Sequence, residues 1–155
     1  MGYYIMPKFD TNLSCFLQNQ KGLQRIDSIL TISFQLIGIM KIVHKAGRSY
    51  NDMKPQNVMI SYKNKEVFNS SELDVTIIDF GFVDKFKDEK KAYAHIERNE
   101  TVEMFQGNLL FASVDHMKFF RTSRKDDVIA MFYMMIHLMC NNNFCGSQEA
   151  LYKLK

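Results

Sequence analysis

Four polar side chains, in two short stretches of the sequence, are of the types that phosphate and magnesium chemistry needs. Residues 50–60 read YNDMKPQNVMI, which places Asp52, Lys54 and Asn57 in one short turn, and DFGF begins at Asp79. In phosphoryl transfer a carboxylate orients the attacking hydroxyl, a cation contacts the transferred phosphate, and amide and carboxylate oxygens hold magnesium. The chain has one residue for each task. The spacing therefore predicts a magnesium and phosphate site.

The full pattern is more specific than its parts. An isolated Asp-Phe-Gly arises often by chance, whereas Asp-x-Lys-Pro-x-Asn followed by two strand-like runs and Asp-Phe-Gly is a strong signal. Pro55 stiffens the turn, and Gly81 permits a sharp bend after Phe80. The alternative is a capped turn between a helix and a strand, with polar residues that are unrelated to one another.

The sequence at this point resembles the protein kinases, and among them the serine/threonine kinases of the casein kinase 1 family. The Lys two residues after the Asp in DMKPQN is typical of the serine/threonine class. The Tyr-Asn-Asp variant resembles divergent, ciliate-like members of the group. The order and approximate spacing agree from residue 3 to about residue 145. Three further segments carry the resemblance: YYIMPKFDTNLSCFL at 3–17, GNLLFAS at 107–113 and SRKDDVIAMFY at 123–133.

The resemblance implies an α+β, protein-kinase-like fold, with a mostly helical C-lobe that carries a small β-hairpin. The N-lobe is expected to be largely absent from residues 1–155, which would form a partial kinase domain. The implied segments are a hinge at about 3–10, a catalytic loop at 50–57, the DFG motif at 79–81, an activation segment at 82–113 and a buried helix at 124–140.

The resemblance also implies roles for individual residues. Asp52 would be the catalytic base, and Lys54 would contact the transferred phosphate of ATP. Asn57 would act in the catalytic loop and, with Asp79, would bind Mg²⁺. Asp127 would brace the catalytic loop from the start of the following helix. The expected cofactors are ATP and Mg²⁺, and the expected partner is a protein substrate with Ser or Thr acceptors.

Three substitutions depart from the family pattern. Tyr50 and Asn51 stand where the family has His-Arg, and without that Arg we expect no control through a phosphorylated activation loop. Asn108 replaces a Thr, which is expected to weaken a brace on the catalytic Asp. Phe132 replaces a small Gly, so local packing in the buried helix is expected to differ.

A further departure concerns the nucleotide clamp. No Gly-rich loop and no Val-Ala-Ile-Lys strand precede residue 3 in this sequence. Because positioning supplies most of the rate enhancement in phosphoryl transfer, we expect weak or no activity from this chain alone. Two alternatives stay open: a non-catalytic, pseudokinase-like remnant that binds a protein partner, and a chain with no stable fold.

The elements that must position these residues can be read from periodicity and capping. We expect a strand at 3–9, a short helix at 12–20 capped by Asp10, Thr11 or Asn12, and a hairpin of 57–62 with 73–80. A long polar loop is expected at 84–106. A helix is expected at 25–45, ending before Gly47, with a core-facing stripe of Ile26, Ile29, Leu30, Ser33, Phe34, Ile37 and Met40.

The last helix begins after Ser123, and because it is apolar nearly all round we expect it to be buried on every side. The rest of the sequence is too short to cover it fully. Some faces of the helix are therefore expected to stay in contact with water.

Composition limits the partners. The net charge of +3 and the pI near 8.7 fit an acidic or phosphate ligand but not nucleic acid. We expect the apolar stretches to be too short or too polar to span a membrane, and the opening residues lack a signal-peptide pattern, so an intracellular location, cytoplasmic or nuclear, is expected. Cys15, Cys140 and Cys145 fit free thiols, although His137 with the last two could instead form a metal site. The oligomeric state is left open.

Overall fold

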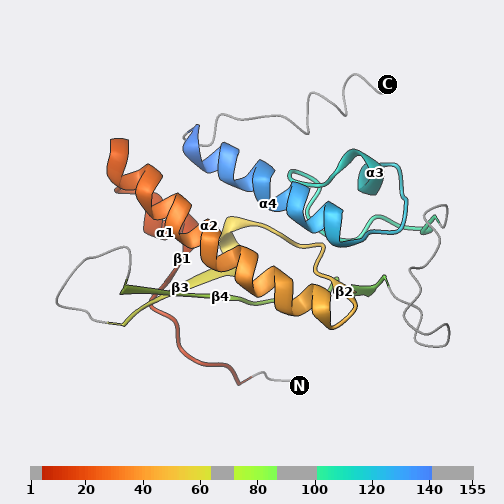
Figure 1. Cartoon of the computed structure of the whole chain (residues 1–155), viewed down its shortest axis with the longest axis horizontal. Helices are drawn as coiled ribbons and strands as arrows, with labels where there is room; N and C mark the ends of the chain where they lie inside the picture. The colour runs from red at the N-terminus through yellow and green to blue at the C-terminus, as the bar shows by residue number, and fades with distance from the viewer. Residues whose placement is uncertain (1–4, 64–71, 87–100, 141–155) are drawn as a thin grey trace.

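Two long helices and a small antiparallel sheet frame the computed structural model, which describes residues 5–63, 72–86 and 101–140 (Figure 1). Its helices are α1 (Leu13–Leu17), α2 (Gly22–Lys45), α3 (Val114–Met117) and α4 (Arg124–Met139), with a 3₁₀ turn at Pro55–Asn57. Its strands are β1 (Thr11–Asn12), β2 (Arg48–Ser49), β3 (Val58–Tyr62), β4 (Leu73–Ile77) and β5 (Asp84–Lys85). The mixture of helices with a small hairpin agrees with the expected α+β class. The expectation about the N-lobe stays a prediction.

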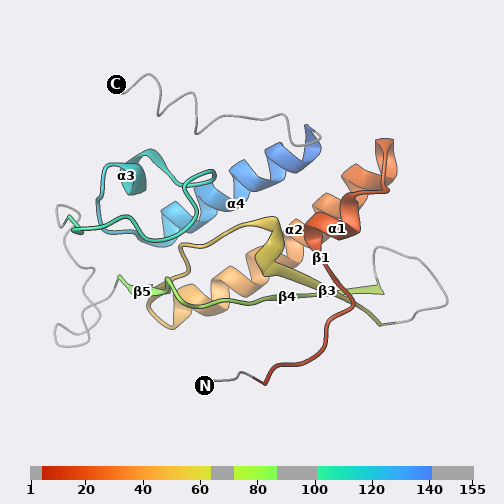
Figure 2. The same cartoon turned by 180° about the vertical axis from the view of Figure 1, so that it is seen from behind.

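Helix α2 lies between α4 and the hairpin of β3 and β4 (Figures 1 and 2). The two long helices run antiparallel, because Arg25 near the start of α2 donates to the carbonyl of Leu138, while His44 near its end contacts Asp127. The hairpin is pinned to the same helix by Gln35, whose side chain bonds the carbonyl of Leu73 at 2.9 Å and the N–H of Val75 at 3.2 Å. Those two groups lie on the edge strand of the sheet.

The predicted core-facing stripe of α2 was only partly right. The helix spans the expected region, but Ile26, Leu30, Phe34 and Ile37 are exposed. The buried residues are Arg25, Ser28, Ile29, Ile32, Ser33, Leu36 and Met40. The helix is apolar on nearly all sides, so apolar spacing alone could not select the buried face. Burial of Arg25 is possible because its guanidinium donates to the carbonyls of Leu17 and Leu138.

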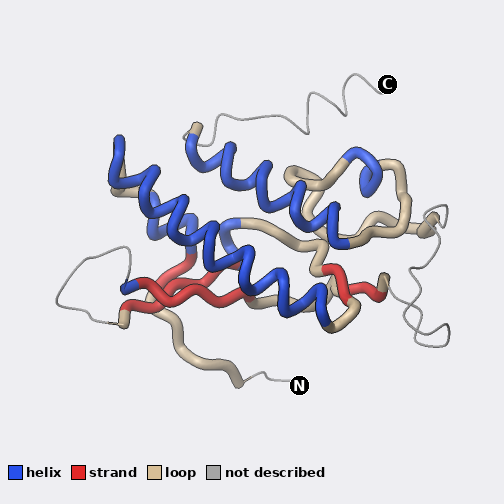
Figure 3. The backbone as a smooth tube through the Cα atoms, in the orientation of Figure 1, coloured by secondary structure: helices blue, strands red, loops and turns tan. Residues whose placement is uncertain are grey.

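The hairpin prediction is confirmed. β3 and β4 pair antiparallel from Val58 opposite Ile77 to Tyr62 opposite Leu73, and β1 pairs with the other side of β3. The predicted strand at 3–9 was wrong where it can be compared, because residues 5–9 form no strand. Ile5 and Met6 are exposed, and the pairing with β3 is made instead by Thr11 and Asn12. The segments are easily followed along the tube in Figure 3.

Capping groups fix the starts of two helices. The Asn12 side chain accepts a hydrogen bond from the N–H of Cys15 at 2.9 Å at the start of α1. Ser123 and Asp126 form a reciprocal capping box at the start of α4. At the other end of α2, Gly47 takes a positive φ of 76° just after the helix stops. The predicted boundaries at these three points are confirmed.

Helix α4 is buried on one face only, so the expectation of burial on every side was wrong. Its Ala130, Met131, Met134 and Leu138 are buried, whereas Val128, Phe132 and Ile136 are exposed. Phe132 is 50% exposed, so the large ring in place of a Gly is not enclosed in the core. The expectation that some faces of this helix meet water is confirmed for the part of the chain that the structure describes.

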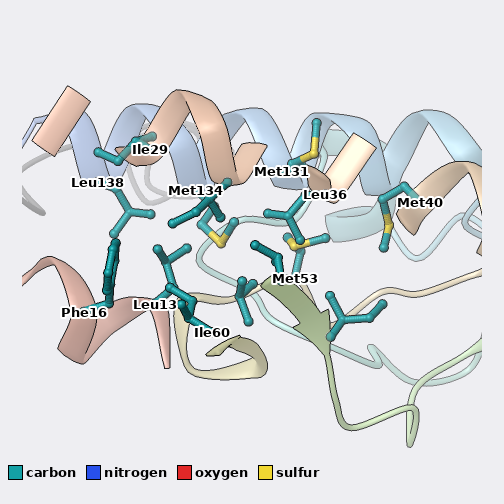
Figure 4. Packing of buried hydrophobic residues seen from close by; sticks show 14 of the residues in the cluster. Leu13, Phe16, Ile29, Leu36, Met40, Met53, Ile60, Met131, Met134 and Leu138 are labelled. Atoms are coloured by element: carbon teal, nitrogen blue, oxygen red, sulfur yellow. The ribbon is translucent and has the colours of Figure 1, made fainter. Parts of the chain in front are cut away.

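The core lies where α1, α2 and α4 converge with residues 50–57, the predicted catalytic loop, which is called the catalytic turn from here on. Figure 4 shows Leu13 and Phe16 of α1, Ile29 and Leu36 of α2, and Met131 and Met134 of α4 gathered with Met53 and Ile60. Met53 belongs to the same turn as the polar residues of the predicted site and is only 1% exposed. The core therefore anchors the turn through its apolar member, while Asp52 and Asn57 are also buried and Lys54 is partly exposed.

Helix α2 is long and apolar enough to cross a membrane by length and composition, which corrects the expectation that no stretch qualifies. Core helices of globular domains meet the same condition. In this structure α2 packs against both α4 and the hairpin, and its Arg25 and Gln35 bond to groups of the same fold. These contacts are those of a core helix.

Candidate active site

The carboxylate of Asp127 holds the turn that contains the predicted site. Its Oδ2 accepts from the N–H of Tyr50 at 2.8 Å and its Oδ1 from the N–H of Asn51 at 2.9 Å. His44 Nε2 lies 2.8 Å from the same Oδ2. Asp127 is 1% exposed, so these bonds are shielded from water. Asp127 therefore makes the hydrogen bonds expected of a residue that braces this turn.

Asp52, Lys54 and Asn57 come together one turn further on. Lys54 Nζ donates to Asp52 Oδ2 at 2.6 Å, and Asn57 Nδ2 donates to the same oxygen at 2.7 Å and to the Asp52 carbonyl at 3.1 Å. Asp52 is 1% exposed and Lys54 is partly exposed. The amide of Asn57 uses its nitrogen on Asp52, which leaves its oxygen as the remaining acceptor.

The hairpin register brings Asp79 to the same end of the sheet. The N–H of Ile78 donates to the carbonyl of Asn57 at 3.0 Å, so Asp79 follows directly after the residue paired with Asn57. Asp79 is exposed, with a positive φ of 61°, and its Oδ1 accepts from the N–H of Gly81 at 3.3 Å. A non-glycine residue in this backbone region is strained, and such strain concentrates at functional sites.

Tyr50 links the turn that contains Asp52 to the segment that contains Asp79, a role that the sequence did not reveal. Its hydroxyl donates to the carbonyl of Ile78 at 2.5 Å. Its ring meets that of Phe80 edge to face, with 5.6 Å between centroids. Burial raises the pKa of the Tyr50 hydroxyl well above its ordinary value, and the charges of Asp52 and Asp79 act in the same direction. The phenol therefore stays protonated and able to donate.

Asn51, which replaces the family Arg, makes neutral contacts in its place. Its Nδ2 donates to the carbonyl of Phe82 at 2.8 Å, just beyond the DFG motif. Its own carbonyl accepts from the N–H of Asn108 at 3.4 Å. Asn51 also has a positive φ of 70°, a conformation that Asn tolerates better than Arg. The catalytic turn is thus tied to both ends of the activation segment without a cation at this position.

The end of the activation segment is anchored to α4 by a pair that the sequence analysis missed. Ser113 caps α3 by accepting from the N–H of His116 at 3.1 Å and donates to Asp126 Oδ1 at 2.5 Å. The side chain of Asn108 accepts from the N–H groups of Leu110 and Phe111. Its oxygen therefore serves a local turn, and the expected weakening of a brace on Asp52 stays a prediction. The sequence signal that could have suggested the Ser113 contact is the pair of adjacent residues Asp126 and Asp127 at the start of α4.

Several predicted features lie outside the described residues. Residues 87–100 of the expected activation segment are among them, and so is Cys145. Cys15 and Cys140 are exposed free thiols. Among residues 5–63, 72–86 and 101–140, no group of three His, Cys, Asp or Glu side chains is placed to hold a metal.

The arrangement fits Mg²⁺ and a phosphate chain. Magnesium usually takes one or two carboxylates from the protein and keeps waters and phosphate oxygens as its other ligands. A buried Asn57 oxygen and an exposed Asp79 carboxylate at one end of a hairpin match that ligand set. The partly exposed ammonium of Lys54 donates to the same Asp52 oxygen as Asn57 does, and it can contact a phosphate.

The sequence matches the protein kinase domain family over residues 3–154. A casein kinase 1-like protein of rice (Oryza sativa subsp. japonica) is 28% identical over 112 residues, which cover 72% of this chain and 15% of that protein. A probable casein kinase I homolog of Encephalitozoon cuniculi is 22% identical over 136 residues, or 88% of this chain and 39% of that protein. The B1 kinase of vaccinia virus is 27% identical over 109 residues, or 70% of this chain and 33% of that protein. The chain thus spans 15% to 39% of the length of these relatives.

Proposed function

The chain belongs to the protein kinase family and is of the casein kinase 1 type, and on this premise we propose that it takes part in transfer of the ATP γ-phosphate to Ser or Thr side chains of a protein. The observation that carries the proposal is the hydrogen-bonded set of Asp52, Lys54 and Asn57. Asp127 accepts from the N–H groups of Tyr50 and Asn51 in the same turn, and Asp79 follows Ile78, whose N–H donates to the carbonyl of Asn57.

Each side chain has a task that its position suits. Asp52, fixed by two donors, would accept the proton of the substrate hydroxyl and orient that oxygen. Lys54 would contact the transferred phosphate. The oxygens of Asn57 and Asp79 would hold Mg²⁺, which when bound supplies the positive charge that the phosphate oxygens need.

Activity of the chain by itself is proposed to be weak or nil. Among residues 5–63, 72–86 and 101–140, no Gly-rich loop or Val-Ala-Ile-Lys strand is present to align the nucleotide. Most of the catalytic power in this chemistry comes from alignment and electrostatic positioning. The four residues of the proposed site would hold one side of the nucleotide.

A second candidate is a non-catalytic, kinase-like module that binds a protein. The exposed apolar side chains of α2 and α4 favour it, because apolar surface of this extent often marks an interface. For either function we propose an intracellular location, cytoplasmic or nuclear, where ATP is available and the free thiols Cys15 and Cys140 stay reduced.

The test is a nucleotide-dependent thermal shift on the full chain. ATP with Mg²⁺ is expected to raise the Tm, and Asp79→Ala is expected to abolish the rise. The matched control is Asp74→Ala, which removes an exposed carboxylate on β4. This variant is expected to keep the rise in Tm with Mg·ATP. A Tm unchanged by millimolar Mg·ATP in the unmodified chain would reject nucleotide binding and leave the binding-module candidate.

A further inference from the structure

Asn51 contacts both ends of the expected activation segment, residues 82–113, through uncharged groups. Its side-chain Nδ2 donates to the carbonyl of Phe82 at 2.8 Å, at the start of that segment. Its backbone carbonyl accepts from the N–H of Asn108 at 3.4 Å, near the end of the segment. Gly107 packs directly against the same carbonyl. One residue of the catalytic turn therefore sets the position of two points that are far apart in the chain.

The backbone of Asn51 is itself fixed. Its N–H donates to Asp127 Oδ1 at 2.9 Å, and the residue is buried. Its φ of 70° lies in the left-handed region, which Asn adopts more readily than residues with longer side chains. The side chain reaches the Phe82 carbonyl from this backbone conformation. The contact with Phe82 therefore depends both on the residue type and on the conformation that Asp127 helps to hold.

The last part of the same segment is anchored by bonds that need no added phosphate. The Asn108 side chain accepts from the N–H groups of Leu110 and Phe111 at 2.9 Å and 3.3 Å. Ser113 donates to Asp126 Oδ1 at 2.5 Å, which ties the end of the segment to the start of α4. Every donor and acceptor in these bonds belongs to the unmodified chain. The anchoring of residues 107–113 is therefore complete without a phosphate group.

The charges around Asn51 disfavour a phosphate at this point. Asp52 follows it in the chain, and Asp127 accepts from its N–H. The neighbouring strand β5 contributes Asp84, whose carboxylate lies 3.3 Å from Arg121 Nε. A phosphate placed beside Asn51 would meet these carboxylates and be repelled by them. The neutral amide of Asn51 also supplies no positive charge that could hold the phosphate.

We propose that Asn51 keeps both ends of the expected activation segment against the catalytic turn without phosphorylation of the chain. The proposal rests on the proposed function, because it concerns how the site for phosphate transfer is assembled and regulated. Where phosphorylation orders a segment, it does so through a new pair between the phosphate and a cation. Here neutral contacts of one residue with a fixed backbone hold the segment instead. The segment is therefore in place once the chain folds, and no activating kinase is needed.

The experiment measures amide hydrogen exchange in the full chain by NMR, without nucleotide, before and after phosphatase treatment that is checked by mass spectrometry. The probes are the N–H groups of Val83 and Asn108, and the N–H of Val102 is the internal reference because its bond does not involve Asn51. In the phosphate-free chain both probes are expected to exchange at least about tenfold more slowly than an unprotected amide. Phosphatase treatment is expected to leave their rates within about twofold, and so is a rise in NaCl to about 0.5 M, because salt does not screen neutral contacts.

Two variants at Asn51 locate the effect. Asn51→Gly keeps the positive φ but removes the bond to Phe82, and it is expected to speed exchange at Val83 by about fivefold or more. Asn51→Asp keeps the size of the side chain and removes the donor, and it is expected to act in the same direction. The matched control is Asn19→Asp, the same change at an exposed position, which is expected to leave the rates within about twofold. A melting curve for each variant checks that the fold is kept, and the rate at Val102 detects a general loss of order.

Two results would overturn the proposal. The first is protection of Val83 and Asn108 that is present before phosphatase treatment and lost after it. Arg48 and Lys85, which face each other across the pair of β2 and β5, would then be the cations that hold a phosphate. The second is unchanged exchange at Val83 in both folded variants of Asn51. Each result can be obtained whether or not Mg·ATP raises the Tm, so failure of this proposal is distinguishable from failure of the proposed function.

Discussion

The carbonyl oxygen of Asn51 approaches Gly107 so closely that a Cβ on that glycine would lie 2.2 Å from it. Gly107 also has a φ of 121°, which residues with side chains rarely adopt. The neighbouring Asn108 N–H donates to the same Asn51 oxygen. The catalytic turn and the later part of the activation segment are therefore fitted together with no room for even a methyl group.

Gly107→Ala is expected to destabilise the chain by more than about 2 kcal/mol, because the added Cβ meets backbone atoms and the φ is unfavourable. Urea unfolding followed by circular dichroism measures the change. The control is Gly38→Ala in the middle of α2, where a Cβ meets nothing within 4 Å. That change is expected to stabilise by about 0.5–1 kcal/mol. A neutral Gly107→Ala would mean that the two segments do not pack as described.

Asp127→Ala is expected to cost about 3–5 kcal/mol, since it leaves the buried N–H groups of Tyr50 and Asn51 and the ring of His44 without their acceptor. The loss is read from the midpoint of chemical unfolding. Asp74→Ala removes an exposed carboxylate and is expected to change stability by less than about 0.5 kcal/mol. If both variants lose the same small amount, Asp127 is not the brace of the catalytic turn.

Asp52→Asn is expected to lower phosphate transfer roughly 100-fold to 10,000-fold, because the amide cannot accept the substrate proton. The same variant is expected to retain the Tm rise with Mg·ATP, because Asn57 and Asp79 are unchanged. Transfer is measured with labelled ATP on any preparation of the chain that shows activity, and the thermal shift on the chain by itself. Unaltered transfer in Asp52→Asn would remove this residue from the proposed chemistry.

The imidazole of His116 makes stability depend on pH. Burial lowers the pKa of His116 below its ordinary value of 6.5, so the folded chain binds this proton less readily than the unfolded chain does. Stability is therefore expected to be highest above that value and to fall as pH drops through it toward the folded pKa. His116→Phe, which can keep the stacking with Phe105, is expected to flatten this part of the Tm–pH profile between about pH 7.5 and pH 5.5. An unchanged slope would assign the dependence to another group.

The contacts among three of the predicted site residues could be expected from local sequence, because these residues are near neighbours in the chain. Asp52, Lys54 and Asn57 fall in one turn, and side chains so close along the chain meet once Pro55 and the 3₁₀ turn fix the backbone. The hairpin could be predicted from two β-branched runs, and it accounts for the place of Asp79. Helix starts at Asn12 and Ser123 were likewise readable, because a capping side chain acts on the backbone two or three residues ahead.

Contacts between distant residues could not be read in the same way. The hydrogen bond between Ser113 and Asp126 joins residues 13 positions apart, and the one between Tyr50 and Ile78 joins residues 28 positions apart. Nothing in the local sequence distinguishes these polar groups from others. The buried face of α2 was missed for a related reason. A helix that is apolar all round gives no preference for one side, and burial of Arg25 depends on carbonyls of α1 and α4.

By itself the sequence determined the family and the elements that hold the catalytic turn, because these depend on residue types and short spacings. Only the tertiary structure decided which helix faces are covered and which remain open, and how Asn51 replaces a charged contact with neutral ones. The physical reason is that burial is a property of the partner surface. Apolar side chains such as Phe34 and Ile29 are alike in sequence until the packing of α4 and the hairpin covers one and leaves the other exposed.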